Sequence, residues 1–227
     1  MLYSEFVKVM TTHRMSRYLM ASGGDSRKAM TLYRKNLLIS QELFTIIGCF
    51  EIALRNAIDE HYLNTLGNDW LRSAAAAGGI FDHSETTLTK ETINDGLRKL
   101  KRNYTHSKLV AELGFGFWRF MFAPHQYARA GQTLLRIFPS KPKSTQVTQY
   151  NNSYIFNELA NINKIRNRIA HHEPICFTPL LAVKNTTYVR QNYGGILQLF
   201  QWMNIDEHAL LYGLDHITAV CNDIDNM

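Results

Sequence analysis

The sequence predicts an all-α protein, and three observations lead to that prediction. Apolar residues recur three and four positions apart over long segments, most clearly from Leu43 to Ile58, as on the buried face of a helix. The alternating pattern of a half-buried strand is weak throughout the chain. The 227 residues are 45% apolar and 19% charged, which is typical of a globular protein with its own core. We therefore expect one domain over residues 1–227, built as a bundle of about seven to nine helices.

Local stop signals divide the chain into the expected helices. Asp25 or Ser26 can cap a long helix after a glycine-containing break, and Ser84 is a suitable N-cap for a later one. Pro174 ends the helix before it, because the residue preceding a proline is biased away from helical geometry. We expect helices over 2–21, 26–62, 84–102, 107–113, 124–138, 154–173, 187–203 and 206–224. The last two form a C-terminal helical pair within 179–227.

The cysteine content indicates a reducing compartment. The three cysteines stand far apart without a Cys-x-x-Cys pair, which argues against a disulfide framework or a zinc knuckle. Glu5 and Lys8 interrupt the first apolar residues, so no signal peptide is expected. The longest apolar run, from Leu43 to Phe50, is too short to cross a bilayer. These features predict a cytoplasmic protein that does not bind a membrane.

Positive charge is concentrated in the middle of the chain. Residues 90–143 hold eleven Lys or Arg against three Asp or Glu, whereas residues 204–227 hold five acidic residues and no Lys or Arg. A basic surface of this kind suits a polyanion such as RNA, although an ordinary solvated helix face explains the charges equally well. The residues that we expect to contact RNA are Arg98, Lys99, Lys101, Arg102, Lys141 and Lys143.

A second cluster, Phe115-Gly116-Phe117-Trp118 with the aromatic residues that follow it, also has two interpretations. Closely spaced aromatic side chains can stack on the bases of single-stranded RNA. Such a cluster is more often part of the hydrophobic core, and we favour that interpretation here.

The segment from Asn161 to Pro174 carries the strongest functional signal. Apolar residues at 155, 159, 162 and 169 form one stripe of the expected helix, and Arg166 falls near the middle of that stripe. A guanidinium keeps its proton and is costly to bury without a partner. Arg166 is therefore expected either to pair with a buried carboxylate or to line a wet cleft that takes an anion.

His171 follows Arg166 in the last turn of the same helix. The partly negative C-terminal end of a helix tends to hold a proton on an imidazole, and an imidazole can act as acid or base near neutral pH. Five residues separate the two side chains by about 140° on an ideal helix. Either the last turn loosens before Pro174, or the long Arg166 side chain reaches round. Asn167 lies on nearly the same face as His171, and His172 is the alternative if the register is shifted by one.

Glu51 is the candidate partner for Arg166. It borders the apolar stripe of the long helix, so we expect its carboxylate to pair across helices with Arg166. The simpler alternative is an ion pair with Arg55, one turn along the same helix, worth about 0.3 kcal/mol.

The motif Ile165-Arg166-Asn167-Arg168-Ile169-Ala170-His171-His172-Glu173-Pro174 resembles the Arg-x4-6-His signature of HEPN domains (higher eukaryotes and prokaryotes nucleotide-binding), in particular the Abi-like (abortive infection) branch. Three stretches fit the same branch: Leu32-Tyr33-Arg34-Lys35-Asn36, Glu51-Ile52-Ala53-Leu54-Arg55-Asn56, and Phe115-Gly116-Phe117-Trp118. The resemblance is clearest over residues 16–174. It departs from the family at Lys35, where relatives usually carry Trp. It implies a single multi-helix HEPN-type domain, a homodimer and, in many members, metal-independent RNA cleavage in defence or toxin systems.

These observations lead us to expect an endoribonuclease without a cofactor or metal ion. RNA carries its own nucleophile, the 2′-OH, so Arg166 would bind the scissile phosphate while His171 acts as general base or general acid. One chain offers one such pair, which agrees with a two-fold dimer that shares a cleft. An antitoxin, RNA or protein, is a further expected partner.

Four alternatives to an endoribonuclease differ in how well the sequence fits them. Metal ligation by His171 and His172 is disfavoured, because adjacent helical side chains diverge by about 100° and no His-Glu-x-x-His spacing occurs. A serine or cysteine nucleophile lacks its elbow motif. Anion binding without catalysis, and a purely structural role, stay open. The rival function is a catalytically silent HEPN module that binds RNA or a protein partner.

Overall fold

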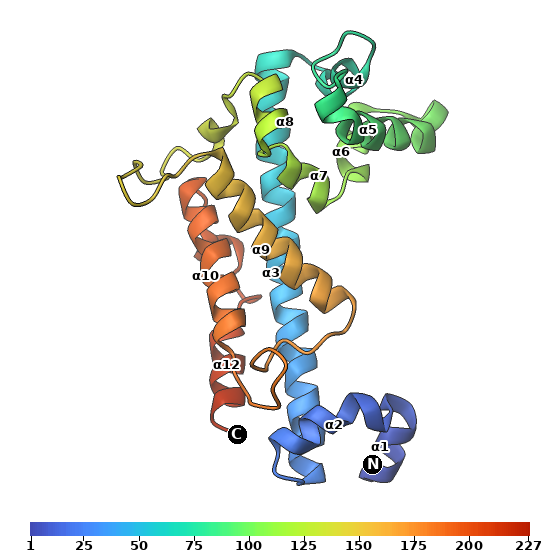
Figure 1. Ribbon diagram of the computed structural model, residues 1–227, viewed down its shortest axis with the longest axis vertical. Coiled ribbons are helices and arrows are strands. Elements are labelled where there is room, and N and C mark those ends of the chain that lie inside the picture. Colours follow the sequence, from blue (N-terminus) through green and yellow to red (C-terminus); the bar gives the residue numbers. More distant parts are fainter. The chain divides into compact units, whose positions relative to one another are not determined.

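The computed structural model describes residues 1–227, and its regular structure is entirely helical (Figure 1). The only β-type pairing is an isolated antiparallel bridge between Phe177 and Lys184. The all-α prediction is therefore confirmed. The α-helices are α1 (Tyr3–Met10), α2 (Thr12–Ala21), α3 (Ser26–Leu66), α4 (Trp70–Ala75), α5 (Thr87–Leu100), α6 (His106–Glu112), α7 (Phe115–Phe120), α8 (Pro124–Arg129), α9 (Asn152–Ala170), α10 (Thr187–Trp202), α11 (Glu207–Leu210) and α12 (Ile217–Asp225). Three 3₁₀ helices join them: η1 (Ser84–Thr86), η2 (Lys101–Asn103) and η3 (Leu134–Ile137).

Twelve α-helices replace the expected seven to nine, because two segments predicted as single helices each form two, and because α4 and α7 lie where no helix was expected. A third predicted helix, 124–138, is also broken and forms α8 and η3. The first break is at Thr11, whose φ is 64° and whose hydroxyl accepts a hydrogen bond from the Arg14 N–H, so that α2 starts anew. The segment 124–138 breaks at Gly131 and Gln132, which both have positive φ. The prediction for 206–224 was also wrong, because that segment forms α11 and α12. Non-glycine residues at positive φ give no clear signal in the sequence.

Two N-cap predictions have different outcomes. The Asp25 side chain accepts hydrogen bonds from the backbone N–H groups of Arg27 and Lys28 at 2.9 and 3.0 Å, so Asp25 caps α3 as expected. Ser84 does not cap α5, because it lies within η1, and α5 begins only at Thr87.

The chain divides into two compact units. The first holds residues 1–48, 164–198 and 207–227, and the second holds residues 49–163 and 199–206. Helices α3, α9 and α10 contribute residues to both units. Whether the chain is a single domain, as the sequence predicts, stays a prediction.

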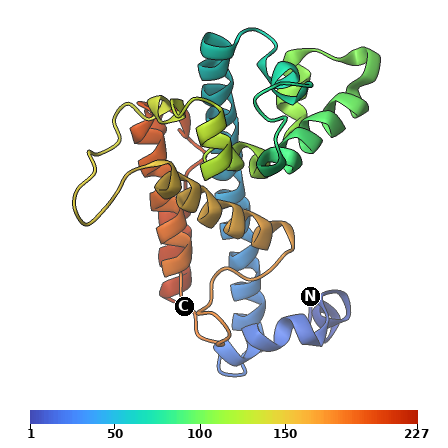
Figure 2. The ribbon, with the colours of Figure 1, turned by 45° about the horizontal axis from the view of Figure 1, so that its top comes forward.

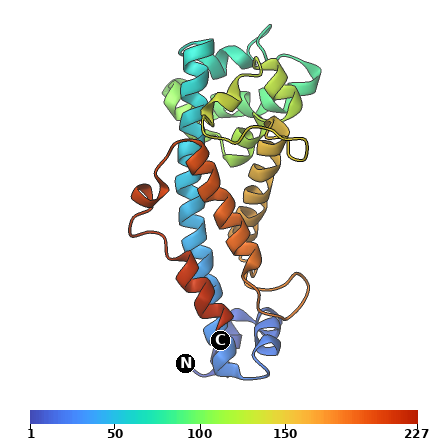
Figure 3. The same ribbon diagram turned by 90° about the vertical axis from the view of Figure 1, so that its left-hand side faces the viewer.

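An aromatic cluster contributes to the core of the first unit. The ring of Tyr33 on α3 contacts Phe6 and Tyr18 edge to face, with centroids 5.6 and 5.2 Å apart, and Tyr18 contacts Phe177 in the same way at 5.0 Å. Lys35 forms an ion pair with Asp223, which holds α12 beside the N-terminal half of α3 (Figure 3). This contact uses the position at which the chain departs from the resemblance.

The aromatic segment 115–122 belongs to the second unit, and its ribbon is drawn in green in Figure 2. Phe120 is 44% exposed, whereas the other four aromatic side chains of the segment are buried. Phe115 and Trp118 are 2% and 0% exposed, and the Trp118 indole N–H donates to the carbonyl of Leu113 at 2.9 Å. Phe50 packs against Phe115 and Phe200, with ring centroids 6.4 and 5.3 Å apart. The core interpretation is confirmed for Phe115, Phe117 and Trp118, and these side chains do not form an exposed stacking platform.

Helix α3 is long and apolar enough to span a bilayer by length and composition alone, since an 18-residue stretch has a mean hydropathy of 1.7. One helix of this kind is weak evidence, because the core helix of a soluble protein has the same composition. One face of α3 is fully buried by the protein itself, and its members include Leu32, Ile39, Leu43, Ile46, Phe50, Leu54 and Ile58. This burial accounts for part of the apolar composition, because Leu37, Leu38, Phe44 and Ile52 of the same helix are 37–49% exposed.

Candidate functional site

The motif helix α9 ends in a tight turn that presents two histidines. The helix stops at Ala170, earlier than expected, and the His171 N–H still donates to the Asn167 carbonyl at 2.9 Å. The His172 N–H donates to Ile169 and the Glu173 N–H to Arg168, at 2.9 and 2.8 Å. With His172 at φ 56°, this is a Schellman motif, in which a residue in the left-handed conformation closes the helix. His172 is one of six non-glycine residues at positive φ in the chain, so this conformation by itself does not mark a functional site.

Arg168 holds the segment that follows this turn. Its guanidinium donates to the Glu173 carboxylate at 3.1 Å and to the Pro174 carbonyl at 2.6 Å, and it lies 5.3 Å from the centre of the Tyr188 ring. These contacts make Arg168 a structural residue of the motif. They also neutralise Glu173, the one acidic side chain beside the two histidines.

Asn36 of α3 holds the segment that follows the turn at the end of α9. Its side chain is 3% exposed, and its carbonyl oxygen accepts a hydrogen bond from the Ile175 N–H at 2.9 Å. Since a buried N–H without a partner costs about 1–3 kcal/mol, the Asn36 side chain fixes the position of the chain directly after the motif. It belongs to one of the stretches that carry the family resemblance.

We expect Asn36→Ala to lower the free energy of unfolding by about 1–3 kcal/mol, because it leaves the buried Ile175 N–H unpaired. Urea denaturation followed by circular dichroism measures this difference. Gln41→Ala, an exposed change on the same helix, is the control and should alter stability by at most about 0.5 kcal/mol. Equal stability of the two variants would show that Asn36 does not anchor the segment.

The histidines of the motif line a hollow together with residues of α2. The hollow has a volume of about 370 Å³. We call it the histidine pocket, and it is lined by His13, Arg14, Ser16, Arg17, Tyr18, His171, His172, Glu173 and Pro174. Two hydrogen-bonded contacts hold α2 in place. Arg14 donates to the His172 carbonyl at 2.8 Å, and Arg17 donates to the carbonyls of Thr178 and Leu181 at 2.5 to 2.8 Å.

The charges of the histidine pocket are mainly positive. Arg14 and Arg17 donate to carbonyl oxygens, which carry no net charge, and neither arginine forms an ion pair. Glu173 is paired with Arg168. Two guanidinium groups therefore keep their charge beside three imidazoles, those of His13, His171 and His172. This arrangement favours an anion that accepts hydrogen bonds, such as a phosphodiester.

The other reactive side chains near the pocket are held neutral. Burial raises the pKa of the Cys176 thiol to about 12, so a thiolate nucleophile is not available there at neutral pH. Burial also raises the pKa of Tyr18 above its usual value. Imidazole is the side chain in this pocket that most often acts as a general acid or base in enzymes.

Arg166 does not line the histidine pocket. Its side chain is half-buried, its Nε is buried without a hydrogen-bond partner, and its Nη1 lies 3.5 Å from the side-chain oxygen of Asn167. His171 and His172 therefore line the histidine pocket, whereas Arg166 and Asn167 do not. Arg55 and Arg119 also have a buried Nε without a hydrogen-bond partner, so this feature does not distinguish Arg166.

Glu51 lies in the second unit and Arg166 in the first, so the pairing expected between them stays a prediction. The alternative ion pair between Glu51 and Arg55 is not formed, and the Nε of Arg55 is buried without a partner.

The six basic residues expected to contact RNA fall into two groups. Arg98 forms an ion pair with Asp95, and Lys99 pairs with Glu112 at 2.6 Å, so these two charges are partly neutralised. The charged groups of Lys101, Arg102, Lys141 and Lys143 form no ion pair, and only Lys141 of these four is half-buried rather than exposed. These four stay the better candidates for contact with a polyanion.

Sequence reasoning missed His13, Arg14 and Arg17. Their local signal is modest: three basic or imidazole side chains occur within five residues, with His13 and Arg17 one helical turn apart. Nothing in that segment indicates that it contacts residues about 160 positions later in the chain.

No family model matches the chain, and no curated protein or solved structure matches it. The structure also contains no group of three or more His, Cys, Asp or Glu side chains placed to hold a metal ion.

Proposed function

We propose that the chain is a metal-independent endoribonuclease that uses the 2′-OH of RNA as its nucleophile. The observation that carries this proposal is the histidine pocket, where three imidazoles and two arginines without acidic partners line one hollow. RNA cleavage of this kind requires proton transfer and stabilisation of charge at phosphorus. Imidazoles supply the first requirement and guanidinium groups supply the second.

The proposed reaction consists of two proton transfers and the exchange of one P–O bond for another. One imidazole takes the proton from the 2′-OH, whose oxygen then attacks the adjacent phosphorus. The arginine charges stabilise the phosphorane, and a second imidazole gives a proton to the departing 5′ oxygen. The P–O5′ bond breaks, and the products are a 2′,3′-cyclic phosphate and a 5′-OH. We assign one of these roles to His171 and the other to His13, which lines the same pocket from α2.

The resemblance of the motif to Abi-like HEPN proteins supports the same activity. On this proposal the chain is a cytoplasmic effector of an abortive-infection or toxin system, and an RNA or protein antitoxin would restrain it. Induced expression of wild type should slow the growth of the host, whereas His171→Ala should not.

The rival proposal is a catalytically silent HEPN module that binds RNA or a protein. The position of Arg166 outside the histidine pocket favours it, because the Arg and His of the motif do not line one hollow within the chain. Incubation of the purified protein with mixed RNA distinguishes the two proposals, since only the nuclease shortens the RNA.

We expect a homodimer in which the Arg166 side chain of each copy helps to bind the RNA beside the histidine pocket. The reasons are the resemblance to HEPN domains, which implies a dimer, and the half-buried Arg166 guanidinium, which forms no ion pair. Light scattering at micromolar concentration measures the mass, and Arg166→Ala should weaken both RNA binding and cleavage. A monomer that cleaves RNA at full rate would contradict the expectation.

A further inference from the structure

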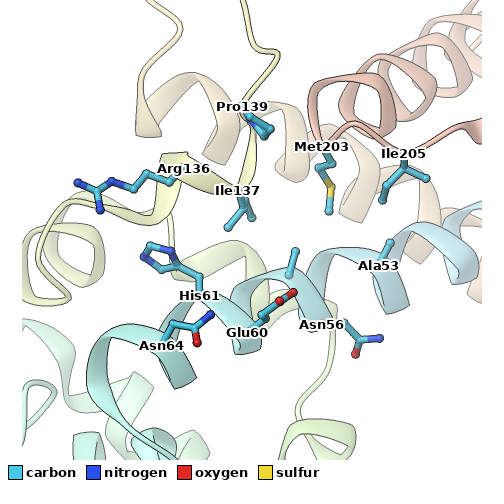
Figure 4. Close-up of a pocket in the computed structure, with 11 residues that line it drawn as sticks. Ala53, Asn56, Glu60, His61, Asn64, Arg136, Ile137, Pro139, Met203 and Ile205 are labelled. Carbon is cyan, nitrogen blue, oxygen red and sulfur yellow. The ribbon is translucent and has the colours of Figure 1, made fainter.

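A second hollow lies in the other unit, along the C-terminal half of α3 (Figure 4). Its volume is about 470 Å³, within the range of small-molecule sites. We call it the α3 groove. The lining side chains of α3 are Ala53, Asn56, Ala57, Glu60, His61 and Asn64, and the remaining ones are Arg136, Ile137, Pro139, Met203 and Ile205. Small alanines on α3 face Ile137, Met203 and Ile205, so the middle of the groove is apolar.

One end of the groove is positively charged. In Figure 4 the Arg136 side chain extends beside the ring of His61. Burial and the nearby Arg136 charge both lower the pKa of His61. The His61 Nε2 lies 2.9 Å from the hydroxyl of Thr133, which fixes the orientation of the ring. No acidic side chain forms an ion pair with Arg136, so this end holds one guanidinium without a counter-ion, beside a His61 ring whose protonated form is disfavoured.

The charge continues into an adjoining hollow of about 400 Å³. The two hollows share Arg136 and Pro139, and the second adds Thr133 and Lys141. The Lys141 side chain is half-buried and forms no ion pair. Arg136 thus lines both hollows, the first together with His61 and the second together with Lys141, and a guanidinium can donate several hydrogen bonds to one anion.

We propose that the α3 groove binds a phosphate monoester carried on a flat or apolar body. The phosphate lies against Arg136 with Lys141 and His61 around it, and the body lies over Ala53 and Ala57. Glu60 also lines the groove, and its carboxylate disfavours a second anionic group on the body. The chemistry can come from a free phosphorylated metabolite or from the phosphorylated end of an oligonucleotide. The site is independent of the proposed nuclease, because none of its residues belongs to the histidine pocket.

The test follows the imidazole of His61 by NMR while phenyl phosphate, inorganic phosphate or benzyl alcohol is added. A bound dianion favours the protonated imidazole, so phenyl phosphate should raise the pKa of His61 towards and above its usual value. Phenyl phosphate should bind more tightly than inorganic phosphate because its ring enters the apolar part of the groove. Benzyl alcohol, which has the ring without the charge, should leave the pKa of His61 unchanged.

Arg136→Gln should weaken phenyl phosphate binding about tenfold or more, the loss expected for a hydrogen bond to a charged group. Lys108→Gln, an exposed change that lines neither hollow, is the matched control and should bind as wild type. Both positions are exposed, so neither change should affect folding. Two short DNA strands, one with a 5′-phosphate and one with a 5′-OH, distinguish the sources. If the protein binds phenyl phosphate and the phosphorylated strand but not the 5′-OH strand, the ligand is an oligonucleotide end. If it binds phenyl phosphate and neither strand, the ligand is a metabolite. Two results would overturn the proposal. One is an unchanged pKa of His61 at about 10 mM phenyl phosphate, a concentration above the Kd of most specific sites. The other is equal binding of phenyl phosphate by Arg136→Gln and by wild type.

Discussion

His171→Ala is expected to lower the rate of RNA cleavage by about 10²- to 10⁴-fold, the usual contribution of a positioned acid or base. The affinity for RNA should change little, because Arg14 and Arg17 keep their charges and their carbonyl contacts in the variant. Cleavage by the variant and wild type is measured under single-turnover conditions, and affinity is measured with a substrate whose 2′-OH is methylated at the cleavage site.

His172→Asn is the control for this experiment. Asparagine tolerates the left-handed conformation that His172 adopts, so the Schellman turn at the end of α9 should persist. We expect this variant to keep most of its activity. If His172→Asn loses activity as strongly as His171→Ala, the catalytic imidazole is that of His172.

The chemistry is checked on the wild-type products. They should carry a 2′,3′-cyclic phosphate and a 5′-OH, they should form in excess EDTA, and DNA of the same sequence should remain intact. Products with a 5′-phosphate, or activity lost on chelation, would refute the mechanism even for a protein that cleaves RNA.

The parts of the fold that the sequence predicts correctly are those governed by helical periodicity. The apolar positions of α3 are buried as their spacing requires, and Ile155, Leu159 and Ile162 of α9 are at most 2% exposed. The boundaries that failed depend on single backbone angles. Thr11 and Gln132 turn the chain at positive φ although neither is a glycine, and the packing around them decides that conformation.

The residues of the candidate site also divide into those that the sequence predicts and those that it does not. His171 and His172 can be found from the motif because one helix and its terminating proline determine where they lie. Arg14 and Arg17 reach the same hollow only through hydrogen bonds to carbonyls 158 to 164 residues away, and local sequence patterns do not encode contacts of that range. The expectation that one chain lacks a second acid–base group was reached without His13, which lines the pocket with His171.

This position of His13 leads to the second large expected effect. His13→Ala should lower cleavage about 10²- to 10⁴-fold, as for His171, because each step of the proposed reaction needs one imidazole. Single-turnover cleavage rates of the two single variants and of wild type measure this difference. Met20→Ala, a change in an exposed residue of α2 that does not line the pocket, is the control and should cleave RNA at close to the wild-type rate.

Mixing the two variants decides whether one chain or two build the site. If His13 and His171 act within the same chain, every chain in a mixture of His13→Ala and His171→Ala lacks one group, and the mixture stays inactive. If His13 of one copy faces His171 of the other, mixed dimers contain one complete site, and activity returns. If two copies instead join their His171 side chains in a shared cleft, His13→Ala alone should cleave RNA as wild type does. We expect the inactive mixture, because His13 and His171 already line one hollow within one unit of a single chain.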